Sequence, residues 1–156
     1  MSAYIESVSG DIEQVFERTY LTSYNTAWES VIEALKYSRQ DVTNPEAGFV
    51  QTKWTDNTNE KNQSESLGST DMYLKAQYRF KINVSKQFTK GNPSVKVTVQ
   101  KEQIVEKDVL EGWRPIPTDS IEESTLLYRV ARIIFIKTKI AQMEEQKVEK
   151  ALESTQ

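Results

Sequence analysis

Two adjoining stretches decide the fold: YNTAWESVIEALKYS at residues 24–38 and, after a polar turn, GFVQTKW at residues 48–54. The first predicts an amphipathic helix from Thr26 to about Tyr37, because its apolar side chains recur at the i, i+3, i+4, i+7 spacing that gathers them on one side. Asn25 is the expected N-cap. A helix this short is marginally stable alone, so a sheet has to cover its apolar side.

The second stretch predicts a strand in which Val50, Thr52 and Trp54 share a face, since side chains alternate along a strand. We interpret Trp54 as a core residue, together with Trp28 on the helix. Residues 16–23 are rich in aromatic and β-branched side chains and predict a strand before the helix.

The clearest strand runs from Met72 to Val84, where apolar and polar residues alternate with period two. A turn at residues 90–93 leads to a second alternating strand that contains Val95 and Val97. This pattern is typical of antiparallel strands with one buried and one solvated face. The alternation is lost at residues 101–104, which indicates a bulge or the end of the strand.

Two connections differ in their expected stiffness. The polar residues 56–70 predict a mobile hairpin loop, because they bury too little apolar surface to offset the entropy lost on ordering. Residues 112–117, GWRPIP, predict a stiff connector, since a residue before proline favours extended geometry.

A long final helix closes the chain. Ser120 and Glu123 have the spacing of a capping box at its start, and apolar positions recur as far as Met143. Beyond that residue, Glu, Gln and Lys predict a solvated helix or a frayed tail.

The predicted order is therefore β-α-β-β-β-α, an α+β fold in which two helices cover one face of a four-stranded antiparallel sheet. We divide the chain into a tether at residues 1–15, a single domain at residues 16–143 and a polar helical or disordered tail at residues 144–156.

The composition excludes several kinds of chemistry. The chain has no cysteine and no histidine, which removes thiol nucleophiles, imidazole bases and the usual zinc ligands. A net charge of −3 without a dense basic run gives no reason to expect a nucleic-acid partner. We find no catalytic motif, and we expect a protein that is not an enzyme and needs no cofactor.

Two acidic groupings have ordinary explanations. The pairs Glu122-Glu123 and Glu144-Glu145 could be acid/base carboxylates, but adjacent helical residues do not face one site, so we interpret them as solvated or capping groups. Residues 56–59 resemble part of a calcium loop but lack its glycine and its final glutamate.

The spacing of apolar residues between Tyr24 and Trp54 resembles that of a known protein family. The pattern is Tyr24-x3-Trp28-x2-Val31-x2-Ala34-Leu35, then Val42 and an acidic turn, then Gly48-x-Val50-x-Thr52-x-Trp54. It resembles the repeated domain of BamC-type (NlpB-like) outer-membrane lipoproteins, which have a helix-grip-like fold and serve the machine that assembles outer-membrane β-barrels. The family's Gly-aromatic pair after the helix is replaced here by residues 37–39, Tyr-Ser-Arg, and a lipidated cysteine is absent.

The resemblance implies a function and a location. The chain would be a non-catalytic module on the periplasmic side of the outer membrane that binds other envelope proteins. Membrane attachment would need a lipid anchor that this sequence does not contain. A cytoplasmic location stays open, as does an alternative function: a carrier that holds a small apolar ligand between sheet and final helix. Its cavity would be lined by Tyr78, Phe80, Val97, Val130 and Ile134.

Two groups of residues are candidate partner-binding sites. Trp113, Arg114 and Ile116 lie in the stiff connector, and an aromatic beside an arginine often anchors an interface; packing of Trp113 against the final helix is the alternative. Lys75, Arg79 and Lys81 share the solvated strand face, where they would either bind an anionic surface or simply aid solubility.

Overall fold

A computed structural model describes residues 15–66 and 72–155 of the chain. The elements, in chain order, are β1 (Val15–Tyr20), α2 (Tyr24–Ala34), β2 (Gln40–Asn44), β3 (Phe49–Thr52), β4 (Thr55–Asp56), α3 (Thr58–Ser66), β5 (Lys75–Thr89), β6 (Asn92–Glu106), β7 (Trp113–Ile116) and α4 (Ile121–Glu153). The expected tether at residues 1–15 lies outside the described residues except for Val15, which begins β1.

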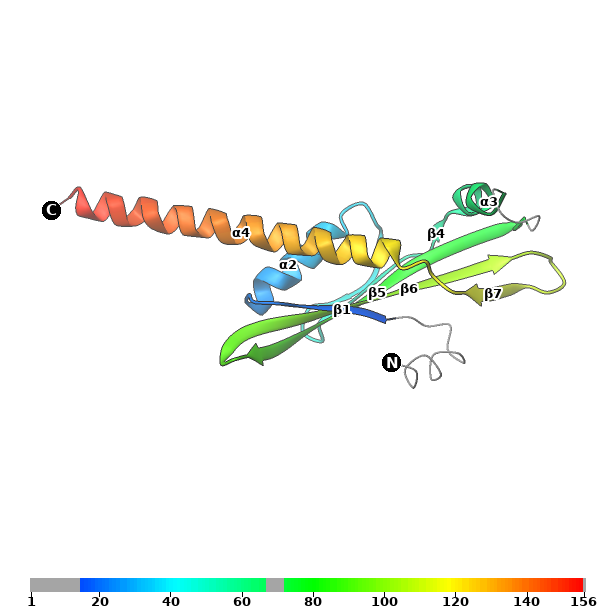
Figure 1. The fold of residues 1–156 in the computed structure, drawn as a ribbon, viewed down its shortest axis with the longest axis horizontal. Helices are drawn as coiled ribbons and strands as arrows, with labels where there is room; N and C mark the ends of the chain where they lie inside the picture. Colours follow the sequence, from blue (N-terminus) through cyan, green and yellow to red (C-terminus); the bar gives the residue numbers. More distant parts are fainter. Residues whose placement is uncertain (1–14, 67–71, 156) are drawn as a thin grey trace.

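The strands form one antiparallel sheet in the order β1-β6-β5-β3-β2, with β7 also paired to β6 and β4 to β5. Helices α2 and α4 lie side by side on one face of this sheet (Figure 1). The predicted α+β class with an antiparallel sheet is confirmed. The predicted four strands and two helices are too few, because the described residues contain seven strands and three helices.

The β5–β6 hairpin is the centre of the sheet. Lys90 and Gly91 at its tip both have positive φ, 52° and 81°, as in the two-residue turns whose twist matches that of paired strands. The register pairs Ile82 with Val99 and Phe80 with Lys101, so the inward side continues beyond the valines without a bulge. The loss of alternation at residues 101–104 therefore marks polar side chains that face inward, not the end of the strand.

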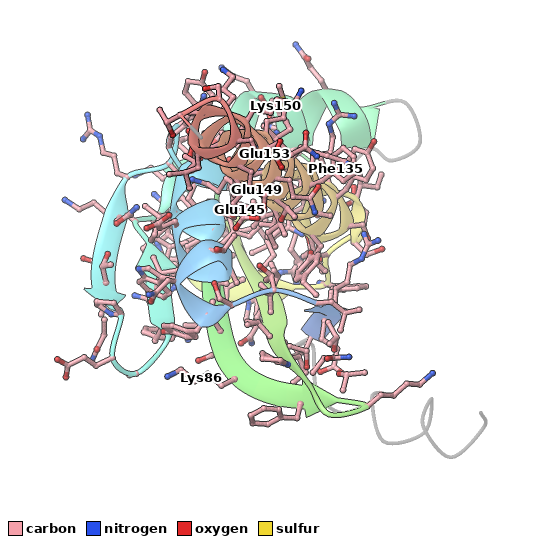
Figure 2. The ribbon with its side chains drawn as sticks, turned by 90° about the vertical axis from the view of Figure 1, so that its left-hand side faces the viewer. Lys86, Phe135, Glu145, Glu149, Lys150 and Glu153 are labelled. Atoms are coloured by element: carbon pink, nitrogen blue, oxygen red, sulfur yellow. The ribbon has the colours of Figure 1, made fainter. Side chains whose placement is uncertain are left out.

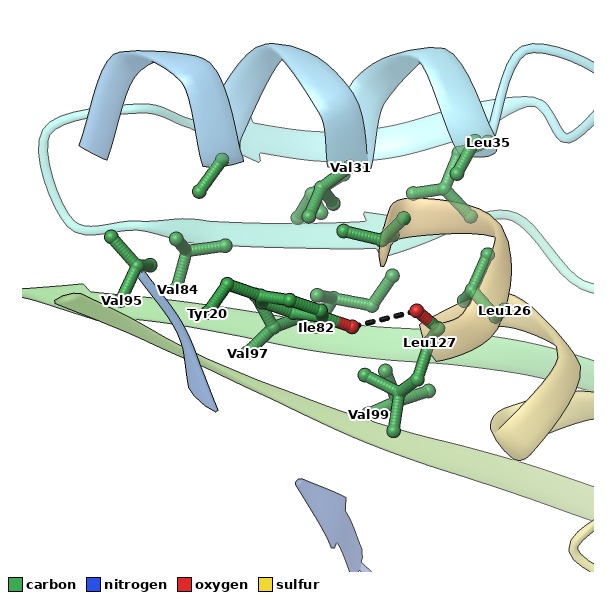
Figure 3. Packing of buried hydrophobic residues seen from close by; sticks show 14 of the residues in the cluster. Tyr20, Val31, Leu35, Ile82, Val84, Val95, Val97, Val99, Leu126 and Leu127 are labelled. Carbon is green, nitrogen blue, oxygen red and sulfur yellow. Dashed lines mark hydrogen bonds between the residues drawn. The ribbon is translucent and has the colours of Figure 1, made fainter. Parts of the chain in front are cut away.

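The core lies between this hairpin and the two helices (Figure 3). The Tyr20 hydroxyl donates a hydrogen bond of 2.6 Å to the carbonyl of Leu127, which ties β1 to α4. Lys137 of α4 lies 3.7 Å from Glu29 and 3.6 Å from Glu33 of α2. The helices are thus fixed to the sheet and to each other.

Helix α2 starts and ends earlier than the predicted helix from Thr26 to about Tyr37. Ser23, not Asn25, is the N-cap, and its Oγ accepts a hydrogen bond of 3.3 Å from the backbone N–H of Thr26. This earlier start places Tyr24 in the first turn, where its ring stacks on that of Trp28 at 6.3 Å. Trp28 is partly buried against the core rather than enclosed by it.

The expected mobile loop is wrong where the structure describes it. Residues 56–66 complete β4 and form α3, whereas residues 67–70 lie outside the described part. Hydrogen bonds hold this polar helix. Asp56 Oδ1 accepts from the backbone N–H of Thr58 at 2.9 Å, and the Asn62 amide makes two bonds to the backbone of Tyr73, at 2.9 and 2.8 Å.

Two expectations near the final helix also need correction. Residues 113–116 of the stiff connector are strand β7, an edge position where a proline is tolerated. The capping box does not form, because Ser120 has a φ of 67° and makes no side-chain cap bond. Glu123 instead accepts from Thr118 Oγ1 at 3.1 Å, and Asp119 Oδ1 accepts from the backbone N–H of Ile121 at 3.2 Å.

Helix α4 continues through the predicted tail to Glu153. Within the described ranges, no helix has both the length and the hydrophobicity that a membrane span requires.

Candidate interaction surfaces

Strand β7 carries three of the predicted binding residues but separates two of them. Arg114 pairs with the buried Val105, whereas Trp113 pairs with Glu106. Since neighbouring residues of a strand point to opposite faces, Arg114 lies on the helix-covered face and Trp113 on the other. Trp113 therefore does not pack against α4, and the two side chains do not present one surface together. Ile116 shares the face of Arg114.

Several exposed apolar side chains lie at the end of the sheet where β5 and β7 begin and β6 ends. The backbone N–H of Leu74 donates to Glu106, the register partner of Trp113, at 2.7 Å. We define the end patch as Met72, Leu74, Val109, Leu110 and Trp113, all exposed. The sequence pattern had placed Met72 and Leu74 on a buried strand face, but β5 begins only at Lys75.

The most exposed member of the end patch is held by a tight turn. The backbone N–H of Leu110 donates to Asp108 Oδ1 and that of Gly112 to the Asp108 carbonyl, both at 3.0 Å. Leu110 is 93% exposed on this turn. An apolar pair, Val109-Leu110, between two acidic residues was the signal in the sequence that could have identified it.

The basic residues of β5 do share one face, as predicted, but two of them are already paired. Glu102 of β6 lies 2.6 Å from Arg79 Nε and 2.6 Å from Lys81 Nζ. Burial raises the pKa of Glu102, but the hydrogen bonds from Lys81 and Arg79 outweigh it and hold the pKa below its ordinary value. Lys75 has Glu106 as its cross-strand neighbour. This face therefore offers little unbalanced positive charge to an anionic partner.

Trp54 belongs to the same face, so its assignment to the core is wrong. The Arg79 guanidinium lies 4.4 Å from the centre of its ring, and the side chain is 36% exposed. The strand alternation breaks because β3 ends at Thr52. The predicted shared face therefore includes Val50 and Thr52 but not Trp54.

The residues expected to line a ligand cavity are divided between the core and a pocket. Val97, Val130 and Ile134 are buried in the core cluster. A cavity of about 220 Å³ lies beside them, at the C-terminal end of α2. It is lined by Ala34, Leu35, Ser38, Tyr78, Phe80, Glu122, Thr125, Leu126 and Arg129. Only Tyr78 and Phe80 of the five predicted lining residues contribute to it.

An ionic cluster in which Lys101 and Glu123 are buried lies next to this cavity. Lys101 Nζ is 2.7 Å from Glu122 Oε2 and 5.0 Å from the centre of the Tyr78 ring. Glu123 is fully buried, and burial raises the pKa of its carboxyl group despite the hydrogen bond from Thr118. Glu123 is therefore not a solvated group, whereas the side chain of Glu122 is 43% exposed. Glu123 is not among the residues that line the cavity.

The calcium-loop fragment has a structural role. The hydrogen bond from the backbone N–H of Thr58 lowers the pKa of Asp56. Thr58 is the first residue of α3, so the Asp56 carboxylate accepts a hydrogen bond at the start of that helix. Among the described residues, no group of three or more acidic side chains is placed to hold a metal ion.

The second half of α4 extends beyond the rest of the fold (Figure 1). In the first half of α4, the inward residues Leu126, Leu127, Val130 and Ile134 are buried, and Lys137 contacts α2. Every residue of Thr138–Glu153 is exposed; we call this segment the overhang. It includes Glu144 and Glu145, which are solvated as expected. At 1.5 Å per residue it reaches about 24 Å.

In comparisons with known proteins, no protein-family model and no curated protein matches this chain. Any functional assignment therefore has to be argued from the residues described above.

Proposed function

We propose that the chain is a non-catalytic protein-interaction module that binds a partner through the end patch. The observation that carries this proposal is the set of five exposed apolar side chains at this one end of the sheet. Folding gives no reason for such a group, and apolar patches of this kind mark interaction sites. Aromatic side chains are enriched in the centres of such interfaces.

The turn at Asp108 supports this function. A backbone already held by two hydrogen bonds loses little conformational freedom when a partner binds. The burial of Val97, Val130 and Ile134 in the core supports this module over a ligand carrier, because the pocket between the sheet and α4 is small and lies at one end of α2.

The cellular setting of the proposal comes from the resemblance to BamC-type lipoproteins. In that setting the module acts in outer-membrane assembly or maintenance, on the periplasmic side, and its partners are other envelope proteins. The α+β arrangement, with a long C-terminal helix across an antiparallel sheet, agrees with that fold in outline.

A site-specific crosslink tests the end patch. A photoreactive amino acid replaces Leu110, and the full chain is irradiated in an envelope extract. We expect one dominant crosslinked protein. Trp113→Ala in the same chain should weaken its capture by about 30-fold, the equivalent of about 2 kcal/mol for an interface anchor.

The matched control is Phe88→Ala, which removes another exposed aromatic ring near the tip of the β5–β6 hairpin. This variant should retain the crosslink. Equal capture by the wild type and the Trp113 variant, with unchanged melting temperatures, would reject the end patch as the binding site. A large fall in the melting temperature of the Trp113 variant would instead show that its ring stabilises the fold.

A further inference from the structure

The overhang has two apolar faces with opposite charges. Residues of the first face, 141, 144, 145, 148 and 149, line a shallow groove and follow the i, i+3, i+4, i+7, i+8 spacing of one helix side. With Leu152 they make up the acidic face, which consists of Ala141, Glu144, Glu145, Val148, Glu149 and Leu152.

The second face carries lysines in place of glutamates. Its members also recur at intervals of three and four, and we call it the basic face: Lys139, Ile140, Met143, Lys147 and Lys150, with Ile136 on the turn just before the overhang. Met143 and Val148 are five residues apart, which places them about 140° apart around an α-helix. Figure 2, which views α4 from its C-terminal end, shows Lys150 on one side of the helix and Glu145 and Glu149 on the other.

Contacts among the described residues do not account for these faces. Ile140, Met143, Val148 and Leu152 are each about half exposed or more. An isolated helix of this length is marginal in water, and it forms here because the packed first half of α4 has already nucleated it. Its apolar side chains therefore stay in solvent unless another molecule covers them.

The charges favour one arrangement of that second molecule. Contact between two acidic faces, or between two basic faces, would bring like charges together. Contact between unlike faces places apolar residues beside apolar residues and lysines near glutamates. We propose that the overhang binds the overhang of a second copy of this chain, with the acidic face of one copy against the basic face of the next.

Such a contact joins two different faces, so it is heterologous and does not end at a dimer. Each bound copy still has one unoccupied face, and the assembly grows until a ring closes or the chain of copies is limited by dilution. The contact is also small. An overhang of about 24 Å buries far less than the ~800 Å² per partner of a standard interface, so association should be weak and should decrease as salt screens the charges.

Sedimentation velocity of the full chain, from about 10 to about 500 µM at low salt, tests this proposal. We expect the average mass of the wild type to rise with concentration beyond that of a dimer, and to fall when salt is added. One variant carries Glu144→Lys, Glu145→Lys and Glu149→Lys, and a second carries Lys139→Glu, Lys147→Glu and Lys150→Glu. Each alone should associate at least about tenfold more weakly than the wild type, the effect of about 1.4 kcal/mol. An equimolar mixture should recover the association, because its faces are again complementary.

A control separates the faces from net charge. Lys36→Glu, Lys53→Glu and Lys90→Glu change exposed lysines elsewhere. Three such exchanges, at two charges each, take the net charge from −3 to −9, as the Lys-to-Glu overhang variant does. The control should associate more strongly than that variant. A wild type that stays monomeric throughout the range overturns the proposal, and so does association that neither overhang variant weakens. Circular dichroism confirms that each variant keeps its helix.

Discussion

At the residue scale, Gly48 is the position where the backbone leaves no room for a side chain. Its φ is 68°, and a Cβ added there would overlap the carbonyl oxygen of Val84 in the central strand β5. We expect Gly48→Ala to lower the free energy of unfolding by at least about 3 kcal/mol, from strain and displaced backbone together. Urea denaturation provides the measurement.

Gly112 is the matched control for this substitution. Its φ is 70°, but a Cβ there would have no atom within 4 Å. Gly112→Ala therefore meets only the conformational cost of the left-handed region, about 1–2 kcal/mol. Equal losses in the two variants would show that β5 moves away from residue 48 without difficulty.

Because of Tyr20, we expect the free energy of unfolding to decrease at alkaline pH. Burial raises the pKa of its hydroxyl to about 12, with Arg18 opposing part of the effect, whereas an unfolded tyrosine has a pKa of about 10. The folded state thus favours the protonated form. The stabilisation is complete below pH of about 10 and is lost as the pH rises towards about 12.

We expect Tyr20→Phe to cost about 1 kcal/mol at pH 8, because the bond to the Leu127 carbonyl is lost. Above pH 10 the wild type should lose stability faster than the variant, so the difference between them should shrink or reverse. Unfolding curves of both proteins at several pH values measure it. A constant difference up to pH 12 would mean that Tyr20 ionises as readily in the folded state as in the unfolded chain.

The burial of single residues was predictable where the periodicity of a helix or strand alone determines which of its faces a residue lies on. Val31 and Val50 are buried as their spacing indicates. The N-cap was not predictable in this way, because Ser23 and Asn25 are both good caps and the stacking of Tyr24 on Trp28 distinguishes them only in three dimensions. Trp54 was misplaced because the sequence does not show that β3 ends two residues earlier.

At the scale of elements, the long alternating or amphipathic segments were predictable and the short polar ones were not. α3 has almost no apolar residues, and its stability comes from hydrogen bonds to residues 73 and 76, which no local pattern reveals. The segment that contains Pro115 was predicted as a stiff connector, yet it is an edge strand, β7, which pairs with β6 in the described structure.

The overhang should be separable from the rest of α4. Ending the chain at Lys137 removes only residues that are exposed in the described structure, so the free energy of unfolding should fall by less than about 1 kcal/mol. The helical signal in circular dichroism should fall in proportion to the residues removed. A loss above about 2 kcal/mol would show that the overhang stabilises the fold of its own chain.

For the whole molecule, the layer arrangement followed from the sequence, but the surfaces did not. Two amphipathic helices and alternating strands have to bury their apolar sides together, which gives an α+β fold. The order of strands depends on pairings between distant residues. The end patch likewise depends on where β5 begins and β6 turns into β7, so Trp113 was the only one of its members that sequence reasoning selected.

This organisation predicts a gradient of amide exchange along the molecule. The central strands β5 and β6 have paired neighbours on both sides and the core on one face, so their amides should exchange only through global unfolding. The buried turns of α4 around Val130 should be nearly as well protected.

Amides of the overhang should exchange much faster, since no part of the described chain covers them and their helix can fray from Glu153 inward. Hydrogen exchange measured by mass spectrometry at about 1 µM, where weakly associating copies are separate, resolves these segments. Raising the concentration should slow exchange in the overhang and leave β5 and β6 unchanged if unlike faces associate. Uniform protection along α4 in the dilute protein would instead require the overhang to pack within its own chain, against the arrangement described here.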